Sequence, residues 1–292
     1  MTSLVFAYSQ LGHDCLKILI DQGEKIVGVI THENSATESI WFDSVADLAR
    51  QRSIPVFTPA NPNTPEMIQL IRQMQPDLIF SFYYRQMISD GIIGIPRLGA
   101  FNMHGSLLPK YRGRCPVNWA MIHGEARTGA TLHYMVKKAD AGDIVDQESV
   151  PIDITDTAGI VMEKINQAAQ KIVMRQLPQL RAGTAPRVVQ DEKDATYFGG
   201  RCAEDGKIDW TMGAWQIYNL IRALQPSPQY PPAFAEIEGE AVTVLKSQIP
   251  TNGIFEPRPV GEVTHRSGAG TEIACGPRGM ERIVLVDYKL FS

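Results

Sequence analysis

Short apolar runs alternate with amphipathic stretches of helical length throughout the first half of the chain. Four runs have the composition of buried strands, residues 4–8, 26–31, 55–58 and 78–82. Helices are expected between them, over residues 13–22, 44–51 and 65–74. Strands that are apolar along nearly their whole length are buried on both faces, and strands separated by helices pair in parallel. The alternation predicts an α/β fold with a Rossmann-like, mostly parallel sheet.

The second half of the chain follows a different pattern. A strand over residues 99–103, a Gly/Pro-rich loop and a long helix over residues 157–180 complete the α/β part. A polar stretch follows, and after it a helical pattern over 210–224 precedes short β-like runs. The length of 292 residues accommodates two domains. We therefore predict a catalytic domain over residues 1–190, a linker over 191–205 and a small OB-like β-barrel domain over 206–292.

Composition and local motifs exclude several classes of protein. The net charge of −4 provides no basic field for a polyphosphate partner. The four cysteines form no C-x-x-C pair, so neither a zinc knuckle nor a disulfide framework is expected. The turn after the first strand, Tyr8 to His13, lacks G-x-G-x-x-G and does not predict a bound dinucleotide. The N-terminus reads as a strand rather than a signal peptide, and no apolar run spans a membrane, so a cytoplasmic protein is expected.

Three polar residues stand where a predicted strand ends. Asn102 and His104 are two positions apart, so their side chains leave the same face of the strand. Asp140 lies in a later Gly-flanked turn that can fold back toward the imidazole. Such a trio suits acyl transfer to an amine. Asn102 can donate to an oxyanion, His104 can move a proton, and Asp140 can orient the ring and favour its charged form.

The spacing alone leaves a purely structural role for His104 equally open. His123 and His133 match no zinc motif, so a structural role and no metal are expected for them. Ser106 is not surrounded by a G-x-S-x-G elbow, which excludes a serine hydrolase of that type.

Residues 101–125, FNMHGSLLPKYRGRCPVNWAMIHGE, closely resemble the signature of formyltransferases that use N10-formyltetrahydrofolate. The later segments Thr131-Leu132-His133 and Lys138 to Gly142 are similar to that family as well. Ile208-Asp209-Trp210 resembles the opening of the family's C-terminal β-barrel domain. The resemblance extends over most of the chain and implies a folate-dependent formyl transfer without a metal.

The resemblance also implies roles for single residues. Asn102, His104 and Asp140 occupy the places of the family's catalytic asparagine, histidine and aspartate. The match is closest to the formyltransferase module of the bifunctional UDP-4-amino-4-deoxy-L-arabinose enzyme of lipid A modification. By that likeness the formyl donor is expected to contact the following residues: Gln86, Met87, Ile88, Arg114, Val136, Lys137, Lys138, Ala139 and Asp140.

Two subfamilies differ in the amine that they formylate, methionyl-tRNA or an amino sugar carried on a nucleotide. Residues 205–292 contain eight basic and ten acidic residues, a net charge of −2, which disfavours tRNA. In the tRNA enzymes the loop after the second strand holds a basic insertion. Here residues 31–42 contain two glutamates and neither lysine nor arginine. A nucleotide-linked amino sugar is therefore the expected acceptor.

The sequence leaves the sugar and the assembly state open. Residues 225–234 replace a shorter Pro-Trp-Pro-Gly-Ala-Phe run common in the family, so the sugar is not specified. UDP-4-amino-4-deoxy-L-arabinose or a related 4-amino sugar is expected, and the assembly state, with a homodimer among the options, is not decided. The alternatives are a methionyl-tRNA formyltransferase and a hydrolase of formyltetrahydrofolate, in which water replaces the amine.

Overall fold

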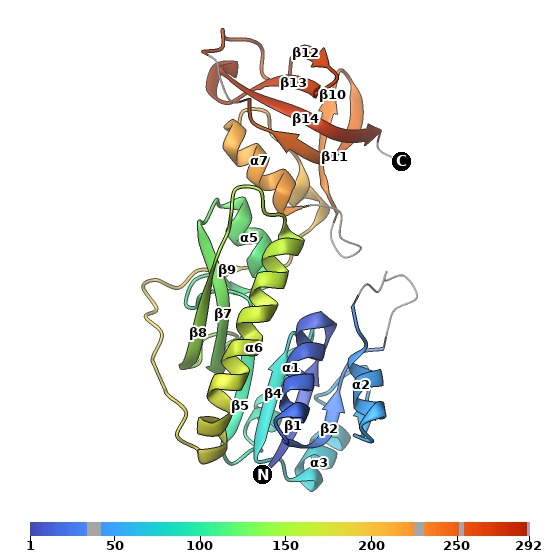
Figure 1. The fold of residues 1–292 in the computed structure, drawn as a ribbon, viewed down its shortest axis with the longest axis vertical. Coiled ribbons are helices and arrows are strands. Elements are labelled where there is room, and N and C mark those ends of the chain that lie inside the picture. The colour runs from blue at the N-terminus through green and yellow to red at the C-terminus, as the bar shows by residue number, and fades with distance from the viewer. Residues whose placement is uncertain (34–41, 225–230, 251–253, 291–292) are drawn as a thin grey trace. The chain divides into compact units, whose positions relative to one another are not determined.

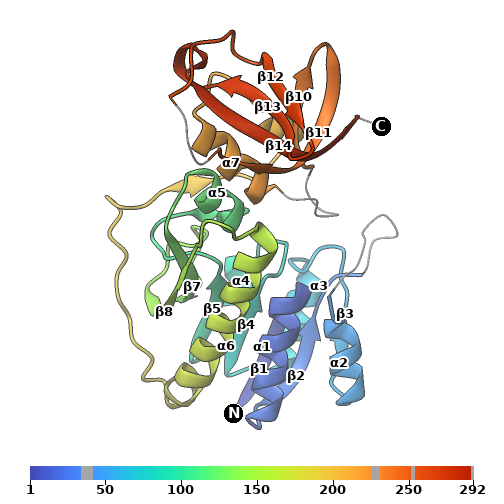
Figure 2. The same ribbon diagram turned by 45° about the horizontal axis from the view of Figure 1, so that its top comes forward.

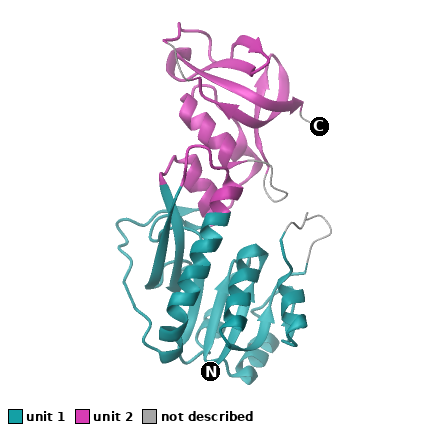
Figure 3. Ribbon diagram, viewed as in Figure 1, with its two compact units in different colours: residues 1–113, 127–151, 163–198 teal, residues 114–126, 152–162, 199–292 magenta. Residues whose placement is uncertain are grey.

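The computed structural model describes residues 1–33, 42–224, 231–250 and 254–290, and the chain divides into two compact units. Unit 1 comprises residues 1–113, 127–151 and 163–198, and unit 2 comprises residues 114–126, 152–162 and 199–292 (Figure 3). This division by compactness does not test the predicted catalytic domain, linker and barrel boundaries, which stay a prediction.

Unit 1 is built on a seven-stranded sheet with the order β3-β2-β1-β4-β5-β7-β8 (Figure 1). Its strands are β1 (Thr2–Ala7), β2 (Lys25–Ile30), β3 (Val56–Phe57), β4 (Leu78–Phe82), β5 (Gly99–His104), β7 (Arg127–Tyr134) and β8 (Ile144–Pro151). The strands β1 to β5 pair in parallel, whereas β7 and β8 are antiparallel to their neighbours. The predicted fold class, an α/β unit with a mostly parallel sheet, is confirmed.

Helices cover both faces of this sheet. They are α1 (Ser9–Asp21), α2 (Val45–Gln51), α3 (Pro65–Met74), α4 (Asp90–Ile93) and α6 (Ala158–Ala182). Two further short strands, β6 (Arg112–Gly113) and β9 (Tyr197–Phe198), pair with each other outside the main sheet. The views in Figures 1 and 2 place α1 and α6 together on one face. Two helix starts are fixed by capping side chains. Ser44 accepts a hydrogen bond from the Asp47 N–H at 3.1 Å, and Thr64 accepts one from the Met67 N–H at 3.3 Å.

The core forms because side chains of each strand alternate between the two faces. Leu4 and Phe6 point to the face that α3 covers, where they form a buried cluster with Ile71. On the opposite face α1 approaches the sheet closely at Gly12. A Cβ atom there would lie 3.0 Å from the Phe82 carbonyl oxygen. Each fully buried large apolar side chain contributes about 1.5–3 kcal/mol to folding, so this core holds the ends of the parallel strands firmly in place.

Unit 2 combines helices with a five-stranded antiparallel sheet of order β10-β11-β14-β13-β12. Its elements are α5 (Pro116–Ile122), α7 (Ala214–Ala223), β10 (Ala233–Ile237), β11 (Glu240–Gln248), β12 (Val263–Ser267), β13 (Gly270–Cys275), β14 (Glu281–Leu290) and the 3-10 turns η1 (Ala203–Gly206) and η2 (Pro277–Gly279). Helix α5 joins α7 through a 2.7 Å hydrogen bond from the Asn118 amide to the Ala223 carbonyl oxygen. The predicted small β domain that begins with a helix is confirmed. None of the helices in the described part of the chain is long and apolar enough to cross a bilayer.

Candidate active site

Strand β5 has one apolar face and one face that becomes polar toward its end. Phe101 and Met103 are buried on one side, and Asn102 and His104 lie on the other, together with Ser81 of the neighbouring strand β4. On this second face apolar residues such as Ala100 fill the earlier part of the strand. The polar side chains therefore gather at the carboxyl edge of the parallel strands, which is where open α/β sheets bind ligands.

Asp140 folds back onto this polar face from the turn that follows β7. Its backbone is left-handed, with φ of 55°, a conformation that is uncommon for residues other than glycine. The Gly113 N–H donates to Oδ2 of Asp140 at 2.9 Å. The other oxygen, Oδ1, lies 3.4 Å from Nδ2 of Asn102 and 3.6 Å from Nδ1 of His104. The structure thus brings together the three residues that the sequence singled out.

A fourth side chain, His133, completes the cluster. It is the direct partner of Asn102 in the antiparallel pairing of β5 with β7. Its Nε2 lies 3.1 Å from Nδ2 of Asn102 and 3.5 Å from Oδ1 of Asp140. Sequence reasoning gave His133 only a structural role. The strand register, which pairs Asn102 with His133, is the signal that places it in the site.

His104 is held in one tautomer by the backbone. Its Nε2 lies 2.7 Å from the carbonyl oxygen of Tyr111, and the side chain is only about 7% exposed. A carbonyl oxygen only accepts, so Nε2 carries a hydrogen. In the neutral ring, Nδ1 therefore has a free lone pair, and it faces Asp140. The nitrogen that can take up a proton is the one beside the carboxylate.

Opposing effects set the pKa of Asp140. Burial by itself raises the pKa of this carboxyl. The charge of His104, the His133 side chain and the Gly113 N–H all lower the pKa, and their combined effect outweighs that of burial. The net result is a pKa well below the ordinary range of an aspartate. Asp140 is therefore a permanent anion at neutral pH, and it stabilises positive charge on the adjacent imidazole.

The residues predicted to contact a formyl donor belong mainly to two segments, which follow the strands on either side of β5. After β4, the Gln86 amide donates to the Ala60 carbonyl oxygen, Met87 is 62% exposed, and Ile88 is buried. Ile88 belongs to the same apolar cluster as Met135, which directly precedes the second segment. The two segments, 86–88 and 136–140, therefore both adjoin this apolar cluster of unit 1.

The second segment is mostly exposed. Val136 is 45% exposed, and Lys137 is also exposed. Lys138 forms an ion pair with Glu192 at 2.9 Å, and the carbonyl oxygen of Ala139 accepts a hydrogen bond from the Tyr197 hydroxyl at 3.0 Å. Arg114, the remaining predicted contact, is exposed and is the first residue of unit 2.

No group of three His, Cys, Asp or Glu side chains among the described residues is placed to hold a metal ion.

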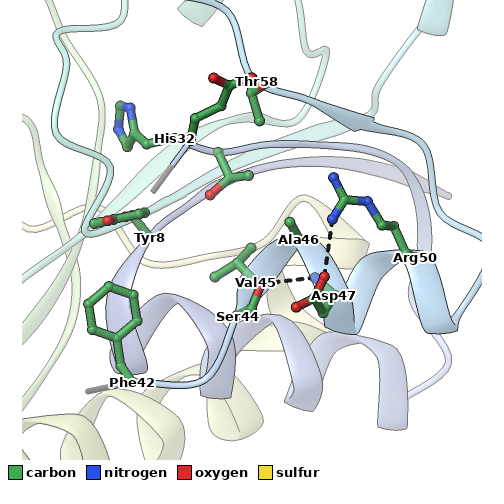
Figure 4. Close-up of a pocket in the computed structure, with 11 residues that line it drawn as sticks. Tyr8, His32, Phe42, Ser44, Val45, Ala46, Asp47, Arg50 and Thr58 are labelled. Carbon is green, nitrogen blue, oxygen red and sulfur yellow. Dashed lines mark hydrogen bonds and ion pairs between the residues drawn. The ribbon is translucent and has the colours of Figure 1, made fainter. Parts of the chain in front are cut away.

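A cavity of about 220 Å³ lies farther along the carboxyl edge of the parallel strands (Figure 4). Its lining comes from the ends of β1, β2 and β3 and from the start of α2, and it includes Tyr8, His32, Glu33, Phe42, Asp47 and Thr58. Two carboxylates, several aromatic rings and the guanidinium of Arg50, which pairs with Asp47 at 3.1 Å, thus surround it.

Both the N-terminal and the C-terminal part of the chain match known protein families. Residues 3–177 match the family described as formyl transferase, and residues 202–288 match the formyl transferase C-terminal domain. The chain belongs to the formyl transferase family. This agrees with the resemblance seen in residues 101–125.

Solved structures with the formyl transferase fold cover nearly the whole chain. WlaRD, described as a sugar 3N-formyl transferase in the presence of dTDP and 5-N-formyl-THF, has a TM-score of 0.75 and 19% identity over 100% of this chain and 98% of that one. An N-formyltransferase from Helicobacter canadensis, in complex with folinic acid and dTDP-3-aminofucose, has a TM-score of 0.74 and 19% identity over 99% of both chains. HypX from Aquifex aeolicus in complex with tetrahydrofolic acid has a TM-score of 0.65 and 16% identity over 99% of this chain and 44% of its own. At these identities the likeness is one of fold.

Proposed function

We propose that this formyl transferase moves a formyl group from N10-formyltetrahydrofolate to the amine of a nucleotide-linked amino sugar. The observation that carries the proposal is the convergence of Asn102, His104 and His133 on Oδ1 of Asp140, at 3.4, 3.6 and 3.5 Å. An amide donor, a proton acceptor and a fixed anion are the groups that acyl transfer to an amine requires.

The reaction follows from these positions. The amine nitrogen bonds to the formyl carbon, the bond from that carbon to N10 breaks, and the proton lost by the amine ends on N10. His104 takes up the proton at Nδ1, where the carboxylate of Asp140 lies 3.6 Å away and stabilises the charged ring. The Asn102 amide donates to the oxygen of the formyl group as negative charge develops there. His133, 3.1 Å from that amide, orients it.

The residues around the cluster suit a folate. Met87 and Val136 expose apolar side chains, 62% and 45% of their surface, on the two segments that flank β5. Exposed apolar side chains next to buried polar groups are typical of a site for a flat heterocycle. We assign Gln86, Met87 and Ile88 and the stretch from Val136 to Asp140 to the donor, with Arg114 as an anion contact. All three structural neighbours described above carry folate derivatives, which supports this assignment.

The cavity beside Tyr8 suits the nucleoside of the acceptor. Glu33 in its lining can accept hydrogen bonds from sugar hydroxyls and base N–H groups, whereas Asp47 pairs with Arg50 of the same lining at 3.1 Å. Strands lie about 4.8 Å apart, and β1 and β2 are two and three strands from β5, which gives a gap of roughly 10–14 Å. A diphosphate with one sugar ring bridges such a gap. UDP-4-amino-4-deoxy-L-arabinose or a related 4-amino sugar is the acceptor that we propose.

The proposal is tested by incubating the protein with the formyl donor and a panel of UDP- and dTDP-linked amino sugars. Mass spectrometry should detect a sugar nucleotide heavier by one formyl group, formed together with tetrahydrofolate. Turnover of the donor with no formylated sugar anywhere in the panel would contradict the proposal. Formate release without an acceptor would identify a hydrolase instead.

A further inference from the structure

Residues 190–198, which we call the strap, form the last segment of unit 1 and run past the catalytic cluster. The strap contains β9, which pairs with β6 at Arg112 and Gly113. We propose that the strap positions both His104 and Asp140, with Gln190 and Thr196 as the positioning residues. This inference rests on the roles proposed above for His104 and Asp140.

Gln190 holds the turn that carries Asp140. Its side-chain amide is buried and donates to the carbonyl oxygen of Asp140 at 2.9 Å and to that of Gly142 at 2.6 Å. Its Oε1 accepts two hydrogen bonds from Arg112, from Nε at 3.1 Å and from Nη2 at 2.8 Å. Arg112 is itself only 1% exposed. One buried amide thus ties the turn to an arginine that cannot move without leaving its charge unpaired.

Thr196 holds the backbone to which His104 is bound. Its Oγ1 accepts a hydrogen bond from the Tyr111 N–H at 2.8 Å, and its carbonyl oxygen accepts one from the Arg112 N–H at 3.0 Å. The carbonyl oxygen of Tyr111 is the acceptor that fixes Nε2 of His104 at 2.7 Å. The position of Thr196 therefore sets the position of the peptide that selects the tautomer of His104.

Three further strap residues contact the Asp140 turn and the Tyr111–Arg112 segment. Glu192 accepts hydrogen bonds from Arg112 and Lys138, which hold its pKa at about 2. The Tyr197 hydroxyl donates to the Ala139 carbonyl oxygen at 3.0 Å. The Phe198 ring stacks on Tyr111 at a centroid distance of 5.2 Å. The contacts to Lys138 and Ala139 end on the turn of Asp140, the Phe198 contact ends on Tyr111, and the remaining contact of Glu192 ends on Arg112, the neighbour of Tyr111.

Gly113 permits the approach of the strap. Its φ is +98°, and a Cβ atom there would lie 2.2 Å from the Phe198 carbonyl oxygen. The same residue donates its N–H to Oδ2 of Asp140 at 2.9 Å. The peptide that pairs with the strap therefore also contacts the catalytic carboxylate, so a shift of the strap displaces that carboxylate directly.

The test compares Thr196→Val with Thr196→Ser, and adds Gln190→Glu. Thr196→Val keeps the shape of the side chain but removes the acceptor of the Tyr111 N–H, whereas Thr196→Ser retains it. Gln190→Glu keeps the acceptor for Arg112 but removes both amide donors to the turn. We expect Thr196→Val and Gln190→Glu to lower kcat by about tenfold or more, because small displacements of reacting groups are costly. KM for donor and acceptor should change less than about threefold, and Thr196→Ser should match the wild type.

Nitrogen NMR of the histidine rings provides a second readout that overall stability does not determine. The neutral wild-type His104 should carry its hydrogen on Nε2. Thr196→Val should produce a mixture of both tautomers, whereas Gln190→Glu should leave the tautomer unchanged while kcat falls. Lys193→Ala, on the exposed side of the strap, serves as the control and should behave as the wild type.

Wild-type kcat in both Thr196→Val and Gln190→Glu would overturn the proposal. So would a loss that appears only as lower thermal stability, with kcat per folded molecule unchanged. If the wild type formylated tRNA or hydrolysed the donor instead, the proposed acceptor would be wrong. The same variants, assayed by that turnover, would still decide the role of the strap.

Discussion

Three side chains lie around the same oxygen, Oδ1 of Asp140, and compete for interaction with it. Asn102 lies at 3.4 Å, His133 at 3.5 Å and His104 at 3.6 Å, so none of the three forms a short bond with it. A proton arriving on His104 strengthens one of these contacts. The Asn102 amide then loses some of its attraction to Asp140 and becomes free to donate to substrate. In the reaction proposed above, proton uptake by His104 is thereby coupled to oxyanion binding by Asn102.

His104→Ala removes the proposed proton acceptor. Because general base catalysis contributes about 10²- to 10⁴-fold to such reactions, we expect kcat to fall by that order, with the fold retained. Steady-state kinetics and circular dichroism check both parts. His265→Ala, at an exposed position on β12, is the matched control. Activity of His104→Ala near that of the control would refute the assigned role.

Asp140→Asn should change how stability depends on acid. The pKa of Asp140 is depressed in the folded state, so its contribution to stability is complete above the unfolded pKa of about 3.9 and is lost as pH falls below it. The free energy of unfolding of the wild type should therefore decrease on acidification from about pH 5 to about pH 3 more than that of Asp140→Asn. Urea titrations at several pH values measure this difference. Parallel curves for the two proteins would contradict the depressed pKa.

Among the elements, the turn between β7 and β8 depends on close packing at Gly142. A Cβ atom at Gly142 would lie 1.9 Å from the Tyr134 carbonyl oxygen. Gly142→Ala should therefore displace the turn, cost about 1–3 kcal/mol in free energy of unfolding, and lower kcat. Gly199→Ala is the control, since nothing lies within 4 Å of its Cβ position. If the unfolding temperature and kcat of Gly142→Ala equalled those of the wild type, the turn would tolerate an added side chain and this prediction would be wrong.

The loop ends that line the cavity should determine how the acceptor binds. Glu33 accepts a hydrogen bond from the Thr58 hydroxyl at 3.1 Å, which leaves its other oxygen for a ligand hydroxyl. Glu33→Gln should raise KM for the sugar nucleotide by about tenfold, because the ligand hydroxyl would donate to a neutral amide oxygen in place of a charged carboxylate, and should leave kcat and KM for the donor unchanged. Glu66→Gln, at an exposed position on α3, is the control. An unchanged acceptor KM would exclude the cavity as the nucleoside site.

Local patterns in the sequence predicted the elements and part of the site. The helices predicted over residues 44–51 and 65–74 correspond to α2 and α3, and the alternation in β5 predicted that Asn102 and His104 share a face, as the structure shows. The antiparallel register that opposes His133 to Asn102 depends on pairing between distant segments, so no local pattern revealed it. Residues 191–198 of the strap fall in the predicted linker because they are polar. Gln190, the last residue of the predicted catalytic domain, contacts Arg112 across a separation of 78 residues, which no local pattern reveals.

Considered as a whole, the chain joins a formyl transferase unit to a C-terminal β unit of the same family. Residues 205–292 carry eight basic and ten acidic residues, and a tRNA-binding surface requires the opposite balance. The loop after β2, most of which lies outside the described residues, contains two glutamates and neither lysine nor arginine between Thr31 and Phe42. Both features support a small anionic substrate over a polynucleotide. Formylation of a sugar nucleotide should accordingly show little of the steep salt dependence expected for tRNA binding.

A competition experiment tests the identity of the acceptor most directly. The protein is given limiting N10-formyltetrahydrofolate with a radiolabelled formyl group, together with equal concentrations of aminoacylated initiator tRNA and UDP-4-amino-4-deoxy-L-arabinose. We predict that the label is recovered on the sugar nucleotide, and that His104→Ala leaves it on the folate. Label on the methionyl-tRNA, or released as formate whether or not the sugar is present, would contradict a sugar nucleotide as the acceptor.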